Sequence, residues 1–139
     1  MPAQTLTYSL PTGPSGAAIN PSSGVFTWRP TVAQENSANP VSVVASDNGT
    51  PNLSATNNFT VTVNPLTQPS MDSSSHAGGQ FSMTVSGQVG PDYTVQVSTN
   101  LATGGWSSIL TTNPVAMPFS FTDTNGAVPV QFFRILVGP

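Results

Sequence analysis

Apolar and polar residues alternate in short runs along this chain. Residues 6–10 read LTYSL, so that three apolar side chains alternate with Thr7 and Ser9. Alternation with a period of two is typical of a strand with one buried face. The same pattern predicts strands at residues 17–19, 25–28, 41–45, 59–63, 81–85, 93–97, 106–110, 119–122 and 130–137. Because Gly, Pro, Asn and Ser separate these runs, we expect an all-β protein.

The spacing of the runs indicates two modules. Residues 67–79 are rich in Ser and Gly and contain Pro69, which is typical of a junction between domains. We therefore predict an Ig-like β-sandwich over residues 1–66, a junction over 67–79 and a second β-sandwich over 80–139. In the first module, the runs at 41–45 and 59–63 are expected to form a long hairpin.

Composition narrows the possible partners. Charged residues make up 5% of the 139 residues, against about 25% in a typical domain. With two Arg, no Lys and a net charge of -3, the chain has no basic patch for phosphates or anionic lipids. No apolar run approaches the roughly 18 residues of a membrane-spanning helix. We therefore expect neither nucleic acid nor a membrane as a partner.

The absence of cysteine bears on how such small modules are stabilised. The chain has no Cys, so no disulfide supports either predicted core. Small sandwiches without disulfides or metals commonly gain stability from neighbouring modules or from assembly. The start at Met1 shows no signal peptide, and we expect that one was removed or that the chain is a piece of a longer protein.

Two segments resemble known families. The first comprises LTYSL at 6–10, GAAIN at 16–20, SGVFTWRPT at 23–31, VVASDNG at 43–49 and FTVTV at 59–63. In order and spacing it resembles the cadherin-like, putative Ig modules of bacterial surface proteins. The second comprises residues 81–87, YTVQVSTNL at 93–101, Trp106, FTDT at 121–124 and FFR at 132–134. It looks like the β-modules that close large secreted bacterial proteins. These resemblances imply Ig-like sandwiches and an extracellular or cell-surface location.

The chain departs from the first family at its start. Members usually have one or two further strands before the LTYSL segment, so the first sandwich is expected to be incomplete. An incomplete sandwich exposes unpaired backbone groups, and a strand from a neighbouring subunit would cover them. We expect residues 4–10 to be the donated strand, with Leu6, Tyr8 and Leu10 filling the neighbour's cleft.

Candidate catalytic groups are few and scattered. Glu35 and Asp47 lie in separate polar loops, and Asp72 and His76 fall in the predicted junction beside three serines, residues 73–75. Acid/base chemistry needs such groups held in one pocket, so we expect no catalytic residue, no cofactor and no enzyme. Asp47-Asn48 is similar to a cadherin calcium corner, but calcium takes six to eight oxygens. We interpret the pair as an Asx turn and expect no metal.

Exposed aromatic rings can stack on sugars. The candidates for sugar stacking are Tyr8, Trp28, Tyr93 and Trp106. Core packing is the favoured interpretation for each, because their neighbours in the alternation are apolar.

Other polar residues carry weaker signals. Asn48, Asn52 and Asn58 each begin an Asn-X-Ser/Thr sequence and are possible glycosylation sites. Arg134 alternates with Phe133 and Ile135, so it is expected to pair with Asp123 or Asp92 at a sheet edge and to guard that edge.

Together these patterns predict a self-assembling, extracellular bacterial structural protein. The expected form is a pilus-like filament or a surface layer, a homo-oligomer joined by donor-strand exchange. The alternative is a carbohydrate-binding or spacer module of a secreted polysaccharide-degrading enzyme, with a glycan as partner. Exposed coplanar rings would favour the alternative, and buried rings with an open sheet edge would favour assembly.

Overall fold

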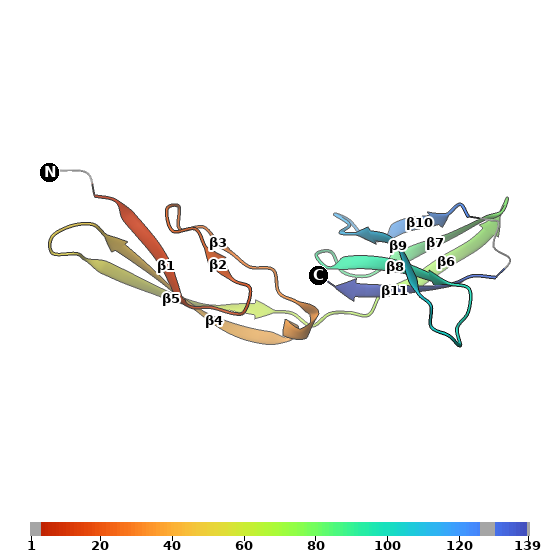
Figure 1. Cartoon of the computed structure of the whole chain (residues 1–139), viewed down its shortest axis with the longest axis horizontal. Helices are drawn as coiled ribbons and strands as arrows, with labels where there is room; N and C mark the ends of the chain where they lie inside the picture. Colours follow the sequence, from red (N-terminus) through yellow and green to blue (C-terminus); the bar gives the residue numbers. More distant parts are fainter. Residues whose placement is uncertain (1–3, 126–129, 139) are drawn as a thin grey trace. The chain divides into compact units, whose positions relative to one another are not determined.

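The computed structural model describes residues 4–125 and 130–138, and these form two compact units, Met1–Pro65 and Leu66–Pro139 (Figure 1). Residues 1–3, 126–129 and 139, which belong to the two expected modules, lie outside the described part. The described residues are strands and loops apart from one 3-10 turn, η1 (Val32–Gln34). The expected all-β class is confirmed.

Unit 1 is built on a three-stranded sheet. Its strand order is β1-β4-β5, and β2 and β3 form a separate two-stranded ribbon. The bounds are β1 (Leu6–Thr12), β2 (Ala18–Ile19), β3 (Phe26–Thr27), β4 (Ser37–Asp47) and β5 (Ser54–Val63). All five strands occur where alternation predicted them.

The β4–β5 hairpin is longer than predicted. Its ladder runs without irregularity from Ser37 opposite Val63 to Ser46 opposite Ser54. The expected strands, 41–45 and 59–63, covered only part of it. The ladder is made by backbone groups, so it continues through Ser, Thr and Asn residues that carry no apolar signal.

The core of unit 1 is thin. Val41, which is 2% exposed, is the one buried hydrophobic residue in the described part of this unit. It lies opposite Phe59 in the ladder, and Phe26 of β3 meets the Phe59 ring edge-on, with centroids 5.8 Å apart. Phe59 is still 38% exposed. The short β2–β3 ribbon therefore covers only part of the sheet's apolar face.

Unit 2 is a sandwich of two three-stranded sheets. Its strands are β6 (Ser70–Ala77), β7 (Gln80–Ser86), β8 (Asp92–Ser98), β9 (Ser107–Thr112), β10 (Phe119–Asp123) and β11 (Phe132–Gly138). The sheet orders are β10-β7-β6 and β11-β8-β9. Phe81 of β7 stacks on Phe133 of β11 at 4.5 Å, so the sheets face each other. Their buried cluster is Met83, Val85, Tyr93, Val95 and Phe121.

The predicted junction is not a loose linker over its whole length. Residues 70–77 form β6, which pairs with β7, and the division between the units falls between Pro65 and Leu66. All residues of β6 are exposed, so it has no apolar alternation to reveal it. The signal that could have found it is Gly78-Gly79, whose φ angles of 60° and 76° suit a tight hairpin turn.

Candidate functional site

The outer edge of β5 is the most prominent interaction feature of unit 1. β5 ends the sheet order β1-β4-β5, so no described strand pairs with its outer side. Residues 54–60 are all exposed, and the ten-residue strand SATNNFTVTV has no charge and no proline. Natural sheets commonly protect their edges with charges, proline or bulges. The outer edge of β5 has none of these features.

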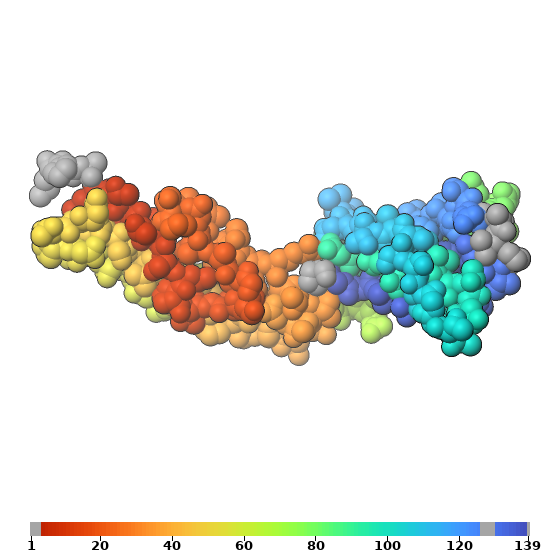
Figure 2. Space-filling model, in the orientation of Figure 1, coloured from red at the N-terminus to blue at the C-terminus, as the bar shows by residue number. Residues whose placement is uncertain are grey.

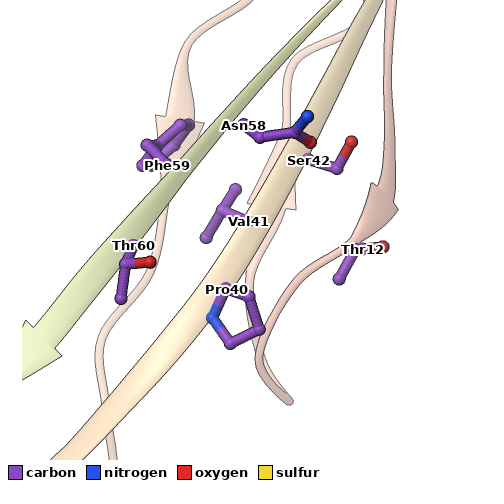
Figure 3. A pocket seen from close by; sticks show the side chains of 7 residues that line it. All are labelled: Thr12, Pro40, Val41, Ser42, Asn58, Phe59 and Thr60. Carbon is purple, nitrogen blue, oxygen red and sulfur yellow. The ribbon is translucent and has the colours of Figure 1, made fainter.

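A shallow hollow of about 330 Å³ lies beside this hairpin (Figure 3). β1 contributes Thr12, β4 contributes residues 40–42 and β5 contributes residues 58–60. None of these seven side chains is titratable in the range of acid/base catalysis. The hollow can make hydrogen bonds and apolar contacts, and it offers no group for proton transfer.

The predicted donated strand lies in its own sheet. β1 pairs with β4 of the same chain, from Leu6 opposite Asp47 to Ser9 opposite Val44. Leu6 is 48% exposed, and both Tyr8 and Leu10 are half-buried. Tyr8 N–H also donates to the Pro21 carbonyl at 2.8 Å. These residues therefore complete unit 1 itself, and their insertion into a neighbour stays a prediction.

The turn between β4 and β5, coloured yellow in Figure 2, is closed by hydrogen bonds of its own side chains. The Asp47 Oδ1 atom accepts the N–H groups of Gly49 at 3.0 Å and Leu53 at 2.9 Å. The Asn48 Oδ1 atom accepts the Thr5 N–H at 2.9 Å, and the Asn52 amide donates to the Asp47 carbonyl. The Asx-turn interpretation of Asp47 is confirmed.

The other candidate catalytic residues do not form a common site. Asp72 Oδ2 accepts a hydrogen bond from the Ser70 hydroxyl at 2.9 Å, and His76 is exposed on β6. Glu35 follows η1 in the other unit. Across residues 4–125 and 130–138, no group of three or more His, Asp or Glu side chains could hold a metal ion. No helix in this part of the chain is long and apolar enough to cross a membrane.

The three possible glycosylation sites are all accessible. Asn48 and Asn52 lie in the turn, Asn58 lies on β5, and each is exposed. A glycan on Asn58 would stand directly beside the open edge. Modification of these residues stays a prediction.

The four candidate aromatic rings have different surroundings. Tyr93 is fully buried, as core packing predicted, so it is excluded as a stacking ring. Trp28 is half-buried and its Nε1 donates to the Ser15 carbonyl at 3.1 Å. Trp106 is not part of the unit 2 core, contrary to the core packing favoured for it. It lies under the Arg134 guanidinium, whose Cζ is 4.3 Å from the ring centroid.

Arg134 does not pair with either predicted carboxylate. Its Nε donates to Gln96 Oε1 at 2.8 Å on the neighbouring strand. Asp123 instead accepts the Asn125 N–H at 2.9 Å, and Asp92 accepts the Asn113 amide at 3.0 Å. The prediction failed because alternation gives the face on which a side chain lies, whereas its partner depends on the pairing of distant strands.

Comparison with known proteins assigns the first unit to a class. The family model described as a putative Ig domain matches residues 2–64. Comparison with curated proteins and with solved structures found no match. The first unit is thus similar to an Ig domain and is followed by a further β-rich unit, and the family comparison identified no catalytic domain.

Proposed function

We propose that this chain is a non-catalytic structural protein of the bacterial cell surface or extracellular space that assembles with copies of itself by β-strand addition. The observation that carries the proposal is the open edge of β5, a ten-residue strand without charge or proline. The thin core around Val41 adds to it, because a neighbouring strand would bury more of the apolar face.

The geometry suits the pairing of β5 with β5 of a second copy. Two antiparallel copies of one strand can be related by a two-fold axis, so one surface serves both subunits. Paired residues must lie on the same face of the joined sheet, since side chains alternate with a period of two. Phe59 can therefore lie opposite Phe59, Asn57 or Val61 of the second copy. Any of these registers joins the apolar faces of the two sheets.

Addition at β5 is the simplest route to assembly. Donation of β1, the route expected from the sequence, would first break its pairing with β4. Addition at β5 leaves every existing ladder intact and adds backbone hydrogen bonds to groups that have no strand partner in the described sheet. Extension into a filament then requires a second, different contact on each subunit.

The test is the oligomeric state of the full chain. Light scattering after size-exclusion chromatography, with electron microscopy of the same sample, should show dimers or larger regular assemblies. Replacing Thr56 and Thr60 together by Lys places two charges on the edge and should yield monomers. The matched control is Ser75→Lys on β6, which should assemble as the native chain does. A monomeric native chain at high micromolar concentration would contradict the proposal.

The alternative function is a carbohydrate-binding or spacer module of a secreted polysaccharide-degrading enzyme. A platform of stacking rings does not support it, because Tyr93 is buried and Tyr8 and Trp28 belong to the other unit. The observation in its favour is the Trp106–Arg134 pair on the outer face of unit 2. A glycan panel that leaves the native chain unbound would remove this alternative.

A further inference from the structure

Polar side chains form a row across the outer face of the sheet β11-β8-β9. Arg134 lies opposite Gln96 in the β11–β8 ladder, and Gln96 lies opposite Ser108 in the β8–β9 ladder. The Arg134 Nε donates to Gln96 Oε1 at 2.8 Å, and Gln96 Nε2 donates to Ser108 Oγ at 3.0 Å. Three strands thus fix the position of one guanidinium group.

The Trp106 ring packs against one face of the Arg134 guanidinium group. The guanidinium carbon is 4.3 Å from the ring centroid, well within the range of about 6 Å for a cation–π contact. A guanidinium held in this way keeps the N–H bonds of its own plane available. Since Nε is used by Gln96, the two terminal NH₂ groups remain to bind an acceptor. Two parallel N–H bonds of this kind match the two oxygens of a carboxylate.

The described part of the chain supplies no such carboxylate. The hydrogen bonds of Asp92 and Asp123 to Asn113 and Asn125 do not involve Arg134, and no described side chain accepts from its terminal nitrogens. The guanidinium is therefore preorganised, half-buried and without a charged partner among residues 4–125 and 130–138. A guanidinium group in this state is expected to bind an anion.

The next row of the same face determines the kind of anion. Leu136 lies opposite Thr94, and Thr94 lies opposite Thr111. The two threonine hydroxyls are 3.0 Å apart, Thr111 is exposed and Leu136 is 43% exposed. Each hydroxyl can make a further hydrogen bond. Hydroxyls, an amide and apolar surface beside one cation match the hydroxyls, C–H groups and carboxylate of an acidic sugar.

We propose that this outer face binds an acidic polysaccharide, with one uronate carboxylate held by Arg134 and neighbouring sugar hydroxyls held by Thr94, Thr111 and Ser108. The site belongs to unit 2 and does not depend on the β5 edge. An acidic protein partner fits less well, because the face has a single cation and no open strand edge at its centre to order a peptide backbone. β8, which carries Gln96 and Thr94, is paired on both sides.

Electrostatics set the expected conditions of binding. The net charge of -3 opposes a polyanion, but at physiological salt this repulsion is screened beyond about 8 Å. The local contact with Arg134 acts at much shorter range. Binding through one half-buried guanidinium should therefore be weak for a single sugar and should decrease further in concentrated salt.

The experiment is a titration of the full chain with oligogalacturonate, followed by Trp106 fluorescence in a Trp28→Phe background and by calorimetry. The native site should bind this probe and leave a neutral oligoglucan of the same length unbound. Arg134→Gln should weaken binding at least tenfold, and Arg134→Lys, which keeps the charge but loses the paired donors, should give an intermediate loss. The matched control, Arg29→Gln, removes the other Arg and should bind as before.

Three results would overturn the inference. They are no binding of oligogalacturonate by the native chain, equal binding by Arg134→Gln and the native chain, and equally tight binding of polyglutamate. Circular dichroism identifies any variant that fails to fold. If Arg134→Gln does not fold, Arg134→Lys is compared with the native chain instead. Arg134→Gln should still assemble, so that loss of sugar binding and loss of assembly are separate outcomes.

Discussion

Replacement of Tyr93 by Phe tests how the β7–β8 loop is held to the core of unit 2. The Tyr93 side chain is fully buried in the cluster between the two sheets. Its hydroxyl donates to the Gln88 carbonyl at 2.7 Å and accepts the Gln88 N–H at 2.8 Å. Gly87 lies so close that a Cβ there would be 2.5 Å from the hydroxyl. The hydroxyl thus ties the β7–β8 loop to the core.

The size of the effect follows from these two hydrogen bonds. Each contributes a net of about 1 kcal/mol, so their loss should lower the free energy of unfolding by about 2 kcal/mol. In a domain of this size, each kcal/mol shifts the melting temperature by about 4–8 °C. We therefore expect the melting temperature of unit 2 to fall by about 10 °C, while the aromatic packing of the ring is kept.

The assay uses the single tryptophan of each unit. In a Trp28→Phe background, urea unfolding followed by fluorescence reports unit 2 through Trp106. The matched control is Tyr8→Phe, read through Trp28 in a Trp106→Phe background. The Tyr8 hydroxyl makes no hydrogen bond within the described residues, so this change should cost less than about 0.5 kcal/mol. An unchanged midpoint for Tyr93→Phe, at an unchanged slope, would refute the reasoning.

Three further changes test unit 1 through its own tryptophan. Gly24→Ala should destabilise it by about 1–2 kcal/mol, because Gly24 has φ of 71° and a Cβ would lie 3.0 Å from the Tyr8 ring; full stability would contradict this. Val41→Ala should cost about 2 kcal/mol in urea unfolding, since it opens a cavity at the only buried hydrophobic residue described in this unit. Asp47→Ala removes the acceptor of two backbone N–H groups, including that of Leu53, and should cost about 1–2 kcal/mol; a thermal scan without change would exclude the proposed role of the turn.

Alternation predicted the strands that bury one face and missed the strand that buries neither. Residues 81–85 and 93–97 contain four of the five buried residues of the unit 2 core, and residues 119–122 contain the fifth, Phe121; all three runs were predicted from alternation. β6 was taken as junction because its eight residues are all exposed and it is held by backbone pairing with β7. Burial leaves a signal in the sequence, whereas an exposed edge strand depends on a turn such as Gly78-Gly79.

The candidate sites were predictable only in part. The alternation correctly placed Arg134 on the opposite face from Phe133 and Ile135. Its partner Gln96 lies 38 residues away, and the ladder that joins them is fixed by tertiary pairing. Core packing was favoured for Trp106 because the predicted strand that it opens ends in Ile109 and Leu110. The irregularity between Val95 and Gln96 in the β8–β9 ladder shifts the register there, and such a shift cannot be predicted from the local sequence pattern.

The two longest edge strands, β5 and β6, differ in the regularity of their ladders. The β6 ladder has an irregularity between Asp72 and Ser75, and Ser73 there has φ of 49°, so this edge is kinked. The β5 ladder is unbroken. If β5 is the contact edge, two subunits joined through it about a two-fold axis form a closed pair. The length of any fibre would then be governed by a second contact, so that conditions which affect only that contact would convert fibres into dimers without unfolding them.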